Sequence, residues 1–286
     1  MWSLSRSTGR RFLCGQGSEN MKLGFFSNAF KHYSLEYAAS ALSEYGYQGL
    51  ELWCKGHHIT PYASPERISY VKELCKSNGL PVYALSAHLD FITDNSEMRA
   101  ENIRRFKKVI DLATAFEVKK VQTASGYLFG KKPADWMWDN FHASMTEVGE
   151  YAAARNVTIN IEPEPEKLLR TPRQLVEFID SIGIPAFSGV VDLSHAIALD
   201  MTPVEFIEAM GEYMNHVHVD DAKYGQHPHK HLIPGEGDVK YREIFEYLES
   251  IKYHDIVSVE LNQHTEYPKE AAKKTIEFLQ VEGFLK

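Results

Sequence analysis

Histidines and carboxylates are concentrated in residues 215–237, which read NHVHVDDAKYGQHPHKHLIPGEG. The stretch opens with alternating polar and apolar residues around His218, a pattern typical of a short buried strand. It continues into a loop that holds His227, His229 and His231 and closes on a Pro-Gly-Glu-Gly turn. Neutral imidazoles and ionised carboxylates are the usual protein ligands of divalent metal ions. The stretch therefore predicts part of a metal site, with a polar loop of incidental histidines as the alternative.

Four apolar runs along the chain end in a residue that can ligate a metal ion. They end in Glu162 (TINIE), Asp192 (GVVD), His218 (HVH) and Glu260 (VSVE). If the fold brings these residues together, three buried carboxylates would repel one another unless a cation lay among them. Three oxygen ligands and one nitrogen ligand favour Mn²⁺, with Mg²⁺, Co²⁺ or Zn²⁺ as alternatives. We therefore expect these residues to bind one divalent metal ion; the alternative is four solvated side chains at loop starts.

The elements that must position these residues are eight repeats of an apolar run followed by an amphipathic stretch. The predicted strands span residues 22–27, 49–53, 82–86, 120–123, 157–161, 189–192, 216–220 and 256–261. Helix starts are marked by Ser64 before a proline and by capping boxes that begin at Thr171 and Thr202. An open doubly wound sheet also alternates strands and helices, but eight repeats without a glycine-rich phosphate loop favour closure. The sequence therefore predicts an α/β fold, a single-domain (β/α)₈ TIM barrel, in which the carboxyl ends of the strands meet at one rim.

Charge and cysteine content narrow the function class. A net charge of −8 argues against binding of nucleic acid, which needs clustered Lys and Arg. No apolar run approaches the ~18 residues of a membrane span, so we expect no membrane partner. The three cysteines, Cys14, Cys54 and Cys75, have no ligand-like spacing and are typical of reduced thiols in a cytoplasmic protein. The sequence leaves open whether the chain forms a homo-oligomer.

The N-terminal segment differs from the rest of the chain. Residues 1–20 contain three arginines and four serines, and no acid precedes Glu19. The segment resembles a short targeting peptide without a clear amphipathic pattern, and an upstream start codon before Met21 explains it equally well. We expect residues 1–20 to form a disordered tail and residues 21–286 to form the catalytic barrel.

The segments IEPEP, VVDLSH, HVHVDDAK…PGEGD and VSVEL together resemble the xylose isomerase-like barrels. That family contains sugar isomerases and epimerases as well as the AP-endonuclease zinc enzymes. The resemblance covers nearly everything after Met21, and the spacing of the four predicted ligands is similar to the family's single-metal site. It implies that the metal ion grips a carbonyl and a neighbouring hydroxyl of a ketose. It also implies that Glu162 and Glu260, on opposite faces, move a proton through a metal-bound enediolate.

The same resemblance suggests residues that bind the substrate. They are Trp53, His88, His195, His229, Lys230 and His231. In the trinuclear zinc endonucleases the last three positions carry an Asp-x-His pair, and a further His follows strand four. In this sequence position 229 is His, and strand four leads into Ala124 and Ser125. These differences argue against a three-zinc cluster. They leave open a second metal ion held by His195, His229 and His231.

The sequence as a whole predicts a metal-dependent isomerase or epimerase that acts on a small-molecule sugar or sugar phosphate. The alternative is a metal-dependent phosphodiesterase of the AP-endonuclease type. A barrel that binds a sugar-like ligand without converting it is the third option.

Overall fold

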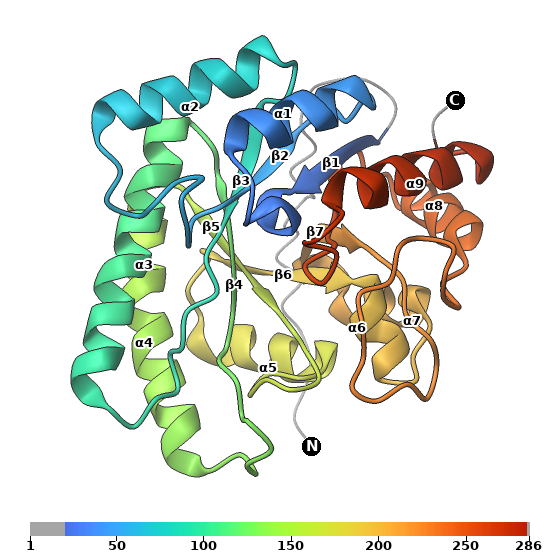
Figure 1. Ribbon diagram of the computed structural model, residues 1–286. Helices are drawn as coiled ribbons and strands as arrows, with labels where there is room; N and C mark the ends of the chain where they lie inside the picture. Colours follow the sequence, from blue (N-terminus) through green and yellow to red (C-terminus); the bar gives the residue numbers. More distant parts are fainter. Residues whose placement is uncertain (1–20, 285–286) are drawn as a thin grey trace.

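The computed structural model describes residues 21–284, so the predicted disordered tail, residues 1–20, lies outside the described residues. Eight strands form a closed parallel barrel in which each strand pairs with the next and β8 pairs with β1 (Figure 1). The strands are β1 Lys22–Phe26, β2 Leu50–Trp53, β3 Val82–Ser86, β4 Lys120–Ala124, β5 Thr158–Glu162, β6 Phe187–Asp192, β7 Met214–Val219 and β8 Ile256–Val259. The predicted single-domain (β/α)₈ barrel is confirmed.

The helices alternate with the strands and surround the barrel (Figure 1). They are η1 Ser27–Phe30, α1 Leu35–Glu44, α2 Pro65–Ser77, α3 Ser96–Phe116, α4 Asp135–Ala153, α5 Pro172–Ile182, α6 Leu193–Ala198, α7 Pro203–Met210, η2 Gly211–Tyr213, α8 Tyr241–Ser250 and α9 Pro268–Val281. The predicted helix starts are confirmed, because the side chains of Ser64, Thr171 and Thr202 all accept a hydrogen bond from a first-turn N–H. No helix within residues 21–284 is both long and apolar enough to cross a membrane.

The sequence analysis did not predict the short helices η1, η2 and α6. α6 begins directly after β6 because the side chain of Asp192 accepts a hydrogen bond from the backbone N–H of His195 and so caps it. A helix of six residues is too short to show an apolar periodicity in the sequence. Its position matters for function, because it begins at one of the predicted metal ligands.

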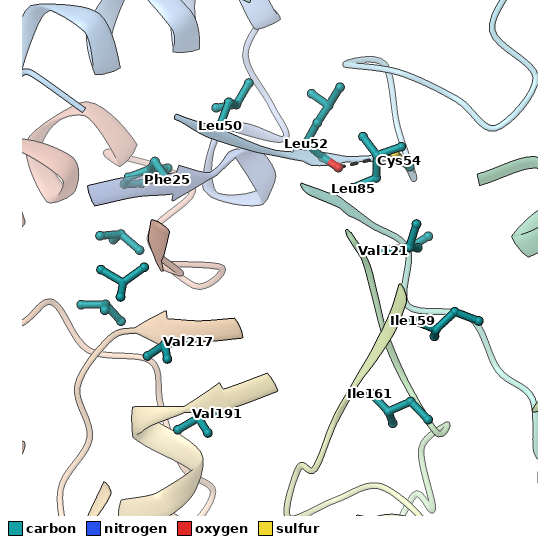
Figure 2. Close-up of a cluster of buried hydrophobic side chains, with 14 of the residues drawn as sticks. Phe25, Leu50, Leu52, Cys54, Leu85, Val121, Ile159, Ile161, Val191 and Val217 are labelled. Atoms are coloured by element: carbon teal, nitrogen blue, oxygen red, sulfur yellow. Dashed lines mark hydrogen bonds between the residues drawn. The ribbon is translucent and has the colours of Figure 1, made fainter. Parts of the chain in front are cut away.

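Apolar strand residues face the surrounding helices. Phe187 of β6, for example, packs edge-on against Phe178 of α5 with 6.3 Å between ring centroids. Figure 2 shows the corresponding side chains of the other strands, among them Leu52, Ile159 and Val217, which are fully buried. Complete burial of one such side chain stabilises a fold by about 1.5–3 kcal/mol. This layer between the strands and the helices is therefore the main hydrophobic core.

The barrel interior is polar below the rim. Successive residues of a strand point to opposite sides, so the residues that alternate with the apolar ones face the barrel axis. A fully buried set of them forms what we name the polar layer: Glu51, Ser86, Gln122, Asn160, His216 and Ser258. Barrel interiors are usually filled by bulky branched side chains. A polar layer in this place supports the polar residues above it, because Glu162, His218 and Glu260 each follow a member of the layer by two positions.

Candidate metal centre and substrate cavity

The four predicted ligands lie together at the carboxyl ends of β5, β6, β7 and β8. One potential ligand atom from each of Glu162, Asp192, His218 and Glu260 lies within 4.8 Å of the others. His218 Nδ1 is central: it lies 3.0 Å from Glu162 Oε1, 2.8 Å from Glu260 Oε2 and 3.8 Å from Asp192 Oδ2. All four side chains are buried. The structure thus places these residues around one point, and their role as metal ligands is a prediction that this geometry supports.

Asp192 owes its orientation to the start of α6. Its Oδ1 accepts hydrogen bonds from the backbone N–H of His195 at 2.9 Å and from the hydroxyl of Ser194 at 2.7 Å. Its Oδ2 is buried and has no hydrogen-bond partner among residues 21–284. A buried carboxylate oxygen without a partner is costly. Because this oxygen faces His218 and the other carboxylates, it fits a bound cation.

Each of the two glutamates offers one oxygen to the cluster and turns the other away. Glu260 Oε1 accepts hydrogen bonds from Asn28 Nδ2 at 2.9 Å and Asn262 Nδ2 at 3.3 Å. Glu260 Oε2 is buried and faces His218 Nδ1 at 2.8 Å. Glu162 Oε1 also faces His218, whereas its Oε2 lies 3.7 Å from His88 Nε2. Both residues therefore retain an oxygen that a substrate could approach.

Without a cation, protons on Glu162 and His218 compensate the negative charge of this cluster. Burial raises the pKa of Glu162 to about 8, even though His218 acts in the opposite direction. Burial also raises the pKa of Glu260, but the positive charge of His218 outweighs it and the pKa is lowered to about 2. Burial lowers the pKa of His218, but Glu51, Glu260 and Glu162 together hold it well above its usual range. A divalent cation would compensate the carboxylates in place of these protons, so the donor set fits one.

Three histidines predicted from the sequence form a second group beside the first. One potential ligand atom from each of His195, His229 and His231 lies within 4.8 Å of the others. The Nδ1 atom of each ring lies close to an acceptor. His195 faces Pro163 O at 3.2 Å, His229 faces Glu166 Oε1 at 3.3 Å, and His231 faces Asp220 Oδ2 at 2.5 Å. Nδ1 contacts of this kind leave Nε2 available for a substrate hydroxyl or a metal ion. The prediction of substrate binding and the option of a second metal ion both stay open for these residues.

A cavity of about 570 Å³ opens above the four candidate ligands. Every predicted substrate-binding residue lines it: Trp53, His88, His195, His229, Lys230 and His231. Glu162 and Glu260 also line the cavity, whereas Asp192 and His218 do not. The two glutamates are thus the predicted ligands that a bound molecule could touch.

One wall of the cavity contains a buried ion pair that the sequence did not predict. Glu164 lines the cavity, and its Oε2 lies 3.3 Å from the ammonium group of Lys167. That ammonium group also lies 3.0 Å from the ring centroid of Tyr127. Burial lowers the pKa of Lys167, although Glu164 acts in the opposite direction. Glu164 is therefore held by the protein itself and is a fixed acceptor in the wall.

Sequence reasoning also missed residues that hold the site in place. Glu51 of β2 is fully buried and contacts His218, Asn28 of η1 holds Glu260, and Asp220 contacts His231. A signal for Glu51 existed, because a carboxylate inside a predicted buried strand needs a partner. Asn28 carries no comparable signal, since its partner lies 232 positions further along the chain.

Residues 39–281 match the family described as xylose isomerase-like TIM barrel. The chain belongs to this family. Within the xylose isomerase-like barrels it is 27% identical over 255 residues to the uncharacterized protein MJ1311 of Methanocaldococcus jannaschii, with 84% of each chain covered. It is 21% identical over 267 residues to fructoselysine 3-epimerase of Shigella flexneri, covering 90% of this chain and 96% of the relative. A solved structure of a D-tagatose 3-epimerase-like protein has a TM-score of 0.73 and 25% identity, covering 92% of this chain and 100% of the other.

Proposed function

We propose that this xylose isomerase-like barrel is a divalent-metal-dependent epimerase or isomerase of a ketose or ketose phosphate. The observation that carries the proposal is the placement of Glu162 and Glu260. Both belong to the cluster of candidate metal ligands, and both reach the cavity above it. The similarity to a fructoselysine 3-epimerase and to a D-tagatose 3-epimerase-like protein favours inversion at the carbon next to a ketose carbonyl.

Glu162 and Glu260 act as the acid–base pair. Each has one oxygen in the cluster and a second oxygen outside it, at Oε2 of Glu162 and Oε1 of Glu260. One glutamate, as the carboxylate, removes the proton from the stereogenic carbon beside the carbonyl, and the other, as the carboxylic acid, delivers a proton to the opposite face, which inverts that carbon. Removal of a proton from C1 instead, with delivery to C2, would interconvert a ketose and an aldose.

A bound cation would make a C–H bond of the substrate more acidic. A divalent ion held by Glu162, Asp192, His218 and Glu260 would draw electron density from a sugar carbonyl and hydroxyl and so acidify the C–H bond between them. Mn²⁺ suits this oxygen-rich ligand set, with Mg²⁺, Co²⁺ and Zn²⁺ as alternatives.

The remaining cavity residues bind and orient the sugar. Burial and the nearby charge of Lys167 lower the pKa of His88 to about 4, so this imidazole is neutral at pH 7 and can hydrogen-bond a hydroxyl. Trp53 offers an aromatic surface to the apolar face of a sugar ring. Lys230, exposed at the rim, is placed to meet a phosphate.

The AP-endonuclease alternative has less support. By the resemblance it would need an additional ligand after β4, where this chain has Ala124 and Ser125. The hydroxyl of Ser125 accepts a hydrogen bond from the backbone N–H of Leu169 and so serves the loop that follows β5.

Solvent-deuterium exchange tests the proposal. The Mn²⁺-loaded protein is incubated in deuterated water with a panel of ketoses and ketose phosphates, and both deuterium uptake and product stereochemistry are measured. We expect uptake at the carbon beside the carbonyl of at least one ketose. Cleavage of an abasic-site duplex without proton exchange in any ketose would refute the proposal and establish the alternative.

A further inference from the structure

Glu51 lies in the polar layer below the metal centre and is fully buried. Its Oε2 lies 3.0 Å from His216 Nε2 and 3.2 Å from His218 Nε2. β2 and β7 are not neighbours in the barrel, so both contacts cross its interior. A single carboxylate oxygen therefore faces two imidazole rings of one strand.

Carboxylates face both ring nitrogens of His218, Glu162 and Glu260 at Nδ1 and Glu51 at Nε2. With a cation bound to Glu162 and Glu260, Glu51 is the carboxylate left to accept a hydrogen bond from the proton-bearing nitrogen of His218. A neutral imidazole that donates Nε2–H to a carboxylate has an unprotonated Nδ1, which is free to bind a metal ion. Nδ1 is the atom of His218 that faces Glu162, Asp192 and Glu260. In the opposite tautomer, Nδ1 would carry a proton and could not be a ligand.

The ring of His218 is also fixed by packing. Phe26 of β1 stacks against it with 5.8 Å between ring centroids and 18° between the planes. His216 packs edge-on against the same ring, with 5.0 Å between ring centroids. The ring plane is thus held by its neighbours, and Glu51 supplies the acceptor on the side of the ring that faces away from Glu162 and Glu260.

We propose that Glu51 is a positioning residue of the metal centre, which holds His218 in the Nε2–H tautomer and directs Nδ1 to the metal ion. The inference rests on the metal centre of the proposed function and is independent of which sugar is converted. A carboxylate behind a histidine ligand also raises the basicity of that ligand. Loss of such a partner typically weakens metal binding by about 10–100-fold.

A separate metal site is the alternative, since ligand atoms of Glu51, His216 and His218 lie within 4.8 Å of one another. That arrangement would take the Nε2 atom of His218 as a ligand. A neutral imidazole has only one unprotonated nitrogen, so His218 cannot serve both sites at once. Metal stoichiometry separates the two arrangements.

Glu51→Gln tests the proposal, because glutamine keeps the size of the side chain but removes its charge and one acceptor oxygen. The metal-free parent and variant are titrated with Mn²⁺ by calorimetry or by competition with a chelator. We expect one equivalent in both proteins, with the variant binding about 10–100-fold more weakly. Two-bond ¹H–¹⁵N spectra of the Zn²⁺-loaded parent should show His218 protonated at Nε2.

Gln122→Met is the matched control. Gln122 belongs to the same polar layer, is fully buried and has no side-chain hydrogen bond among the described residues. Its replacement should leave Mn²⁺ affinity at the parent value. Denaturant unfolding of the metal-free proteins, measured in parallel, separates a weaker site from a weaker fold. If Glu51→Gln does not fold, Glu51→Asp decides, because it keeps the charge but withdraws the carboxylate by one methylene.

Parent-like Mn²⁺ affinity in a folded Glu51 variant would overturn the proposal. A parent that binds two equivalents, of which Glu51→Gln loses one, would overturn it in favour of the separate site. A parent that binds no Mn²⁺ would refute the metal centre itself. By contrast, a parent that binds Mn²⁺ but exchanges no proton in any ketose refutes only the proposed function.

Discussion

Replacing Glu162 and Glu260 by glutamine, one at a time, separates proton transfer from metal binding. Glutamine can still offer an amide oxygen to a cation, but it cannot accept a proton from carbon. General acid–base catalysis contributes about 10²–10⁴-fold to a rate, so each variant should lose at least that much turnover. At about 1.4 kcal/mol per tenfold change, the loss corresponds to about 2.8–5.6 kcal/mol of transition-state stabilisation.

The hydrogen bonds of the two glutamates predict that the variants differ in metal affinity. Glu260 Oε1 accepts from both Asn28 and Asn262, so an NH₂ group at that position would meet two donors unless both amides turned over. An NH₂ group at Oε2 would instead replace the oxygen that faces His218. An unsatisfied buried group costs about 1–3 kcal/mol, which weakens Mn²⁺ binding by about 5–150-fold. Glu162 carries no such restraint, because its outer oxygen faces only His88.

Two measurements are needed for each variant: Mn²⁺ titration of the metal-free protein, and deuterium exchange with the best ketose of the panel. We expect Glu260→Gln to bind Mn²⁺ more weakly than Glu162→Gln, and both to lose turnover. Equal affinities would contradict the reasoning from the asparagine contacts. Exchange and inversion at the parent rate in both variants would show that the glutamates are ligands only, and His195 would then be the next candidate base.

Three further predictions follow from single contacts. His218→Ala should lower the Mn²⁺ content of the protein while circular dichroism shows a folded chain. His142 is exposed, so His142→Ala is the control and should bind Mn²⁺ like the parent. Parent-like Mn²⁺ content in His218→Ala would remove His218 from the ligand set. Lys230→Ala should raise KM several-fold for a ketose phosphate and leave KM for the unphosphorylated ketose unchanged. Lys240 is exposed, so Lys240→Ala serves as the control. Equal effects of Lys230→Ala on both substrates would exclude a phosphate contact. Burial raises the pKa of Asp255, but the charge of Lys120 outweighs burial, and the pKa is lowered from its usual value of 3.8. The ion pair therefore stabilises the fold above pH 3.8, and this stabilisation is lost as the pH falls through the lower pKa of the folded state. Asp255→Asn should therefore reduce the free energy of unfolding at pH 7, and the difference from the parent should shrink below about pH 4; a difference that is constant with pH would contradict this assignment.

The barrel could be predicted from the sequence because its signals are local. Apolar runs, helix caps and capping boxes depend on residues within four positions of one another, and those at Ser64, Thr171 and Thr202 form as expected. Strand ends were less accurate: the last strand ends at Val259, whereas the apolar pattern continues to residue 261. Hydrogen bonding to the neighbouring strand decides where a strand ends, and that neighbour is distant in the sequence.

The candidate site was predictable to the extent that the barrel topology fixes it. Residues at the carboxyl ends of strands must meet at one rim, and this places Glu162, Asp192, His218 and Glu260 together. The contacts that orient these residues were not predictable in the same way. Asn28 of η1 reaches Glu260 although the two are 232 positions apart in the sequence. Glu51 of β2 reaches His218 of β7 across the barrel, between strands that do not pair.

The four candidate ligands also differ in how the protein holds them, and the difference bears on which of them is free to move a proton. Asp192 is restrained by the first turn of α6, His218 by Glu51 and Phe26, and Glu260 by two asparagine amides. Among the described residues, the polar side-chain contacts of Glu162 are to imidazoles: His218 at 3.0 Å, His88 at 3.7 Å and His195 at 3.8 Å. Burial lowers the pKa of His88 and of His195, and a neutral imidazole can donate or accept, so these two tolerate either protonation state of a carboxyl group that faces them. A carboxylate held by two amide donors is instead stabilised in its ionised form. This asymmetry makes Glu162 the better shuttle for a proton that must come on and off, and it makes Glu260 the better anchor for a cation.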